Sequence, residues 1–158
     1  MLNKLFLILA LFLLKIAPAF SQNDFDYTFY PADKYTRQTR IASLDSASQK
    51  VLWKTDSTGS VMRVCVEKKG DELKVFNLSN PTNILYREKV KYLGIDANQC
   101  LIYEAQTEKK EILTLSPVLG FALVTFRNCE GNKFAKNPDD CDKVMHCFGS
   151  ILNQYKLR

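Results

Sequence analysis

The chain has 158 residues with a net charge of +5, and 46% of its residues are hydrophobic. This length suits one domain with a core of its own, and we see no internal repeat, low-complexity tract or linker. The basic residues of 87–91 alternate with an acid and an apolar residue, which is typical of a solvated strand face. Nucleic-acid binding would need clustered positive charge beside stacking aromatics, so we expect no nucleic-acid partner.

The first 21 residues have the three parts of a secretory signal peptide. Lys4 supplies the positive start, residues 5–14 an apolar core, and residues 17–21 a small-residue exit. Lys15 ends the apolar run well short of the roughly 20 residues that span a bilayer. We therefore expect cleavage after Ser21 or after Ala19, a single domain over residues 22–158 without a membrane span, and a secreted or periplasmic location.

Residues 25–59 give weaker signals of strands and turns. Phe25–Tyr30 alternates aromatic and polar residues and predicts a first strand that ends at Pro31. Residues 35–44 carry few large aliphatic residues and give no clear prediction. Asp45–Ser48 fits either a turn or the start of a short helix. Val51–Trp53 is apolar, and we expect Asp56–Gly59 to be a turn that leads into the next strand.

Residues 60–126 predict a run of antiparallel strands. Met62, Val64 and Val66 alternate with polar residues, and Gly70 can supply the positive φ of a hairpin turn before residues 73–78. We expect the further turns at residues 80–83 and 94–98, with strands over residues 84–93 and 100–105. Residues 112–126 are apolar at both odd and even positions. This pattern indicates two strands that are covered on both faces and meet near Pro117.

The last part of the chain predicts a helix over residues 138–156. Asn137 fits an N-cap, Pro138 the first helical position, and the acids that follow suit the positive end of the helix dipole. Apolar residues then recur at helical spacing at Val144, Phe148, Ile151, Leu152 and Tyr155. We expect this apolar stripe to pack against the sheet.

Five cysteines in an exported chain allow disulfides and leave one thiol over. Cys141 and Cys147 could not bridge each other on an intact helix, since six residues separate them by roughly 9 Å along its axis. Cys129 is the expected partner for one of the two, with a slight preference for Cys141. Cys65 and Cys100 could then pair across the sheet, which would leave Cys147 as a thiol.

No catalytic, cofactor or metal motif stands out. His146 and Cys147 are adjacent, but on a helix adjacent side chains diverge by about 100° and could not act as a pair. Residues 129–147 lack the paired short spacings of a structural zinc site. The acids are dispersed, and there is no phosphate-binding loop or serine-elbow pattern. We therefore expect no enzyme, no cofactor and no metal site.

The sequence thus predicts a mainly β fold: an antiparallel meander of about seven to nine strands, closed as a barrel or folded as a sandwich, with one C-terminal α-helix. The expected function is a non-catalytic binding or cell-envelope interaction module for a small apolar ligand or a protein partner. Trp53, Tyr86 and Tyr92 are the candidate binding residues. The alternative is a secreted enzyme that uses dispersed carboxylates or a thiol at Cys65 or Cys147.

Overall fold

The computed structural model describes residues 25–130 and 137–150, and every structural statement below concerns that part of the chain. The expected signal peptide, residues 1–21, lies outside the described residues, as do residues 151–156 of the expected helix.

Strands make up nearly all of the regular structure of the described residues. They are β1 (Tyr27–Phe29), β2 (Tyr35–Leu44), β3 (Val51–Ser60), β4 (Val64–Lys69), β5 (Glu72–Asn77), β6 (Asn80–Ile95), β7 (Leu101–Ala105), β8 (Ile112–Ser116), β9 (Phe121–Asn128) and β10 (Asp142–Gly149), with one 3₁₀ turn at Pro138–Asp140. The prediction of a mainly β, antiparallel chain is confirmed, although the described part holds ten strands rather than seven to nine.

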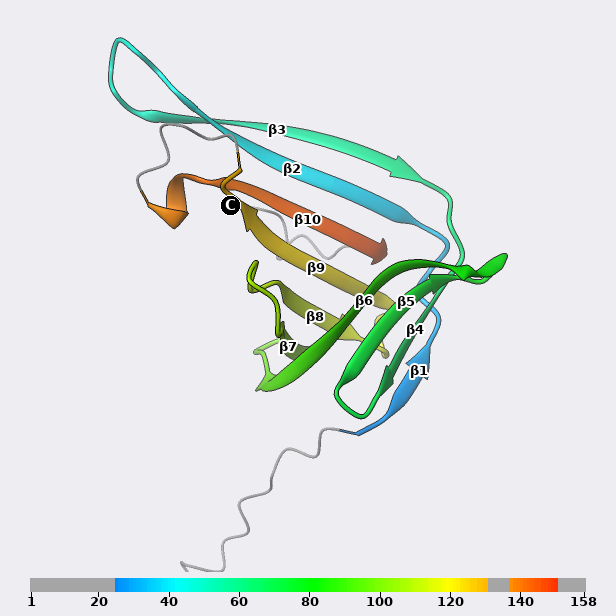
Figure 1. Ribbon diagram of the computed structural model, residues 1–158. Helices are drawn as coiled ribbons and strands as arrows, with labels where there is room; N and C mark the ends of the chain where they lie inside the picture. Colours follow the sequence, from blue (N-terminus) through cyan, green and yellow to red (C-terminus); the bar gives the residue numbers. More distant parts are fainter. Residues whose placement is uncertain (1–24, 131–136, 151–158) are drawn as a thin grey trace, which may run out of the picture.

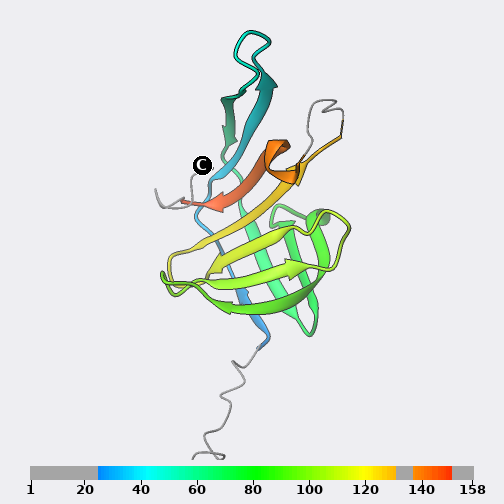
Figure 2. The same ribbon diagram turned by 90° about the vertical axis from the view of Figure 1, so that its left-hand side faces the viewer.

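The ten strands form one antiparallel sheet in the order β1-β4-β5-β6-β7-β8-β9-β10-β2-β3. The sheet curls strongly, as Figures 1 and 2 show. The long strand β6 helps to turn it, because its first part pairs with β5 and its second part, after Lys89, pairs with β7. Only residues 30–34 separate β1, which pairs with β4, from β2, which pairs with β10. The short link holds these two distant parts of the sheet close together.

The main core lies on the concave side of the curled sheet. It takes at least one buried side chain from each of eight strands, all except β2 and β3. Leu73, Leu113 and Leu115 are fully buried in it. Alternation along each strand supplies these residues, because every second side chain points to the same face. The predicted inward parity of Val64 and Val66 is confirmed.

A second cluster lies on the opposite face of β9 and β10. Phe121 and Leu123 of β9 meet Met145 and Cys147 of β10 there, together with Cys100. Their neighbours Ala122 and Val124 belong to the main core. Strand β9 is therefore covered on both faces, as its apolar residues on both parities predicted.

Several predicted turns are confirmed, and two are wrong. The β4–β5 hairpin turns at Gly70, whose φ is +59°, and β8 and β9 meet through the turn that contains Pro117. In contrast, residues 80–83 belong to β6 and residues 56–59 to β3. Both stretches carry turn-forming residues. Residues 56–59 nevertheless pair with residues 36–39 of β2, whereas in residues 80–83 only Asn80 has a partner on β5, before a register shift that separates it from the next pair.

The predicted C-terminal α-helix is wrong for its described part. Pro138–Asp140 forms one 3₁₀ turn with Asn137 before it, and Asp142–Gly149 is strand β10, paired with β9 on one side and β2 on the other. Val144 and Phe148 are four residues apart, a spacing that matches one face of a strand as well as one face of a helix. The segment forms a strand because the edges of β2 and β9 both pair with it.

The Cys129–Cys141 disulfide is formed, with 4.8 Å between the two Cα atoms. It links the end of β9 to the start of β10 rather than a strand to a helix. The Cys65–Cys100 pairing that the sequence allowed is not formed, and Cys147 is also outside any disulfide. Cys65 lies in β4, whereas Cys100 packs in the second cluster against β9 and β10, so the two thiols belong to separate parts of the sheet.

Candidate functional site

A partly open cavity of about 200 Å³ lies beside the main core. Its walls come from β6, β9 and β10 and from the segment before β8: Leu85, Tyr86, Glu111, Val124, Phe126, His146 and Phe148. The lining is mainly apolar and aromatic, with His146, Tyr86 and Glu111 as its polar members. Apolar walls with a few placed polar groups are the usual composition of a small-molecule site.

His146 is fixed in this wall by aromatic neighbours and one hydrogen bond. Its Nδ1 lies 2.8 Å from the hydroxyl of Tyr35, which reaches it from the adjacent strand β2. The ring of Phe126 stacks on the imidazole with 6.1 Å between centroids and 9° between planes. No hydrogen-bond partner for Nε2 occurs among residues 25–130 and 137–150. His146 is therefore a cavity-lining residue whose second ring nitrogen has no hydrogen-bond partner in the described part of the chain.

The surroundings keep this imidazole neutral. Burial lowers the pKa of His146, and the positive charge of Arg37 lowers it further. Burial also raises the pKa of Tyr35, so the phenol keeps its proton. A neutral imidazole carries its proton on one nitrogen and a lone pair on the other. If Nδ1 accepts a hydrogen bond from Tyr35, Nε2 is a donor; if Nδ1 donates to Tyr35, Nε2 is an acceptor.

Tyr86 and Glu111 form the second polar contact of the cavity. The Tyr86 hydroxyl donates a hydrogen bond of 2.9 Å to Oε2 of Glu111. Burial and the nearby carboxylate of Glu111 both raise the pKa of Tyr86, so it stays a phenol. The phenol oxygen retains a lone pair, and the pair can therefore accept one further hydrogen bond from a bound molecule.

The structure separates the three candidate binding residues. Tyr86 lines the cavity. Tyr92 packs against the core, with its ring 5.3 Å from that of Tyr103. Trp53 lies on β3, where Arg40 and Lys143 approach its ring at 4.7 and 5.5 Å. Three separate places therefore hold these residues, and only Tyr86 belongs to the site.

Sequence reasoning missed most of the aromatic wall. Val144, His146 and Phe148 share one face of β10, but the helical interpretation of this segment placed His146 on a surface away from the others. Applying the two-residue period of a strand would have grouped His146 with Phe148. Tyr35 carried no such signal, since it reaches His146 across 111 residues of sequence.

Cys65 and Cys147, the two thiols considered for an enzyme, are poor nucleophiles. Cys65 and Cys147 are buried, and burial raises the pKa of both, that of Cys147 to about 12. A thiolate, not a thiol, is the reactive form. Neither residue lines the cavity, whose one carboxylate is Glu111.

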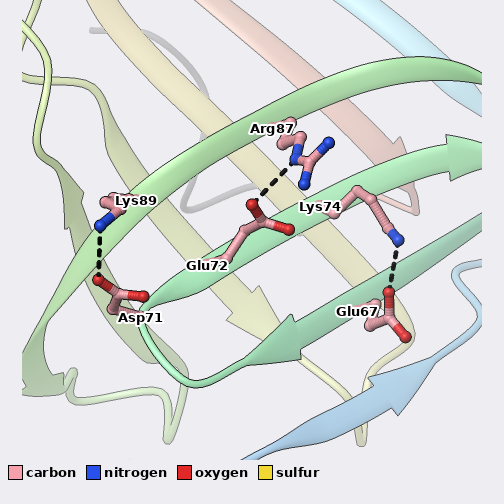
Figure 3. Close-up of polar contacts among 6 residues, drawn as sticks. All are labelled: Glu67, Asp71, Glu72, Lys74, Arg87 and Lys89. Carbon is pink, nitrogen blue, oxygen red and sulfur yellow. Dashed lines mark hydrogen bonds and ion pairs between the residues drawn. The ribbon is translucent and has the colours of Figure 1, made fainter.

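The charged convex face of β4, β5 and β6 offers no comparable site. Figure 3 shows three ion pairs there, joining Lys74 to Glu67 at 2.7 Å, Arg87 to Glu72 at 2.9 Å and Lys89 to Asp71 at 3.4 Å. The acids and bases neutralise one another across neighbouring strands. This pattern is that of the solvated face expected for residues 87–91.

A wider depression of about 900 Å³ runs over the region of Ile112, Arg127 and Lys143. Its lining mixes acids and bases, with Glu104 and Glu108 beside Lys109 and Lys110, so it defines no single ligand chemistry. The smaller cavity is better enclosed and has a coherent apolar wall. We therefore place the candidate site there.

In residues 25–130 and 137–150, no helix is long and apolar enough to span a membrane. Comparisons with protein-family models, curated proteins and solved structures find no match to this chain.

Proposed function

We propose that this chain is an exported, non-catalytic binding protein that holds a small, mainly apolar molecule in the cavity beside His146. In this proposal the curled sheet works as a barrel, with β1 and β2 as two parts of one bent strand that closes it. The observation that carries the proposal is an aromatic cavity with one uncommitted imidazole nitrogen.

The cavity volume limits the ligand to a single ring or a short chain. An engineered protein cavity of roughly 150 Å³ holds one benzene molecule, and the cavity here is of similar size, at about 200 Å³. Phe126 and Phe148 supply faces for an aromatic ring. With the imidazole proton on Nδ1, facing the Tyr35 oxygen, Nε2 accepts one hydrogen bond, so a ring that donates one N–H or O–H group, such as indole or phenol, fits the chemistry.

Export is supported by the signal-like residues 1–21 and by the disulfide. The Cys129–Cys141 bridge suits an oxidising compartment. We therefore infer a secreted or periplasmic location, and native mass spectrometry of the exported protein would show any molecule retained from its source.

The test uses indole and phenol as probes and the methyl groups of Val124 and Leu85 as reporters. Titration of the exported protein, followed by ¹³C-methyl NMR, is expected to shift both signals, with dissociation constants in the roughly micromolar to millimolar range. Val124→Phe should fill the cavity and weaken binding at least tenfold. Val118→Phe is the matched control, because Val118 is 95% exposed in the β8–β9 turn and lies outside the cavity.

Two results would overturn the proposal. One is the absence of methyl shifts with either probe at millimolar concentration, together with no retained mass. The other is equal binding by wild type and by a folded Val124→Phe variant. Either result would favour a protein partner on the surface over a small ligand.

A further inference from the structure

Strand β3 is the long open edge of the sheet. It has ten residues, pairs only with β2 among the described strands, and is exposed over Lys54–Ser60. The opposite edge, β1, has three residues. In Figures 1 and 2 the β2–β3 hairpin projects from the rest of the sheet. A long exposed edge is a template for pairing with a further strand.

The hairpin register shows which backbone groups face the open edge. The Asp45 N–H donates to the Lys50 carbonyl at 2.9 Å, and Leu44 lies opposite Val51. Hydrogen-bonded and non-hydrogen-bonded pairs alternate in an antiparallel ladder, so the even-numbered residues of β3 bond to β2. The odd-numbered residues direct their N–H and C=O groups outward: Val51, Trp53, Thr55, Ser57 and Gly59. No hydrogen bond within residues 25–130 and 137–150 uses these outward groups.

The charges on β3 are complementary to a second copy of the same strand. Lys54 and Asp56 flank Thr55, both are exposed, and they form an ion pair of 3.3 Å on one face. In an antiparallel pair with a two-fold axis at Thr55, each Lys54 lies opposite the partner's Asp56. A shift of the register by one pair in either direction would put Lys54 against Lys54 or Asp56 against Asp56. Like charges directly opposite each other are destabilising, so the charges favour the register with the axis at Thr55.

The same register also satisfies the backbone. With the axis at Thr55, Trp53 meets the partner's Ser57 and Val51 meets the partner's Gly59, and all of these have outward hydrogen-bonding groups. Lys54 and Asp56 then occupy non-hydrogen-bonded positions, where opposite side chains come closest. Backbone and charge patterns thus agree on one arrangement.

We propose that the protein forms a two-fold symmetric dimer by antiparallel pairing of β3 with β3 of a second copy, centred on Thr55. The contact uses one patch on both copies, so it closes after two chains instead of growing into a filament. One strand pair is small beside the interfaces of permanent dimers, so we expect a dissociation constant of roughly micromolar magnitude. The inference does not depend on the proposed ligand cavity, which lies on other strands.

Charge reversal tests the register. Lys54→Asp gives a strand with two acids, and Asp56→Lys gives one with two bases, so each variant alone faces like charges across the axis. Each should dimerise at least tenfold more weakly than wild type in sedimentation velocity. An equimolar mixture of the two variants should recover dimers, because both opposite positions are then complementary. The double variant K54D/D56K should also recover them.

Cysteine crosslinking tests the axis independently. A Thr55→Cys variant should form a disulfide-linked dimer under mild oxidation, since position 55 lies opposite itself. Ser57→Cys is the control: its two copies would be four residues apart in register, or roughly 13 Å, beyond disulfide reach.

A wild-type protein that stays monomeric at several hundred micromolar would overturn the proposal. So would dimers that survive both charge reversals, or equal crosslinking at positions 55 and 57. Trp53, the only tryptophan, gives a further readout. Its fluorescence should change on dilution in wild type and stay constant in Lys54→Asp.

Discussion

Replacing Gly149 by alanine tests the structure of the C-terminal segment, because a strand and a helix give this substitution opposite signs. Gly149 has a φ of +98° in β10. Residues with a Cβ adopt left-handed conformations at a cost of about 1–2 kcal/mol. A Cβ atom here would overlap the carbonyl oxygen of Gly120 and lie 3.0 Å from the Cα of Phe121. Overpacking of this kind costs about 1–3 kcal/mol, so we expect a total loss of about 2–5 kcal/mol in the free energy of unfolding.

Gly70→Ala is the matched control. Gly70 also has a positive φ, +59°, but a Cβ atom there would meet nothing within 4 Å. We expect a loss of about 1–2 kcal/mol from the backbone conformation alone. The difference between the two variants isolates the contact of Gly149 with the Gly120–Phe121 backbone.

Urea unfolding of both variants, followed by far-ultraviolet circular dichroism, measures these values. The midpoint should fall more for Gly149→Ala than for Gly70→Ala with little change in the slope m. In a helix interior, alanine is more stable than glycine by about 1 kcal/mol. A Gly149→Ala variant that is as stable as wild type, or more stable, would therefore refute the assignment of β10 as a strand.

Three further predictions concern the cysteines and His146. Replacing both Cys129 and Cys141 by serine opens a loop with a sequence separation of 12 and should cost about 3 kcal/mol of unfolding free energy, measured by the same urea method; an unchanged midpoint would contradict a structural role. The three remaining thiols, all buried, should resist iodoacetamide in the native protein and react after unfolding, which intact mass spectrometry counts; rapid native labelling would contradict their burial. The pKa of His146 is lowered in the fold, so the unfolded state binds its proton first and stability should fall as the pH drops below 6.5. Thermal unfolding between pH 7.5 and 5 should show this fall in wild type and less of it in His146→Gln, and an equal fall in both would contradict it.

The sequence by itself determined the β character of the chain and several of its turns. Alternation at Val64 and Val66 identified an inward face, and Gly70 identified a hairpin, because both signals come from neighbouring residues. The double-sided burial of β9 was also visible in its apolar residues on both parities. The preferred disulfide, Cys129–Cys141, was also predicted correctly, although the argument for it assumed a helix that the structure does not contain.

Tertiary structure decided the state of residues 142–149 and, with it, the candidate site. Val144 and Phe148 fit a helix and a strand equally well, so their spacing does not distinguish the two structures. The edges of β2 and β9 decided it, since β10 completes the backbone hydrogen bonds of both. This pairing brings His146 to Tyr35, 111 residues away, and places His146 in the wall of an aromatic cavity. Contacts over such separations depend on the path of the whole sheet, which no local period or propensity encodes.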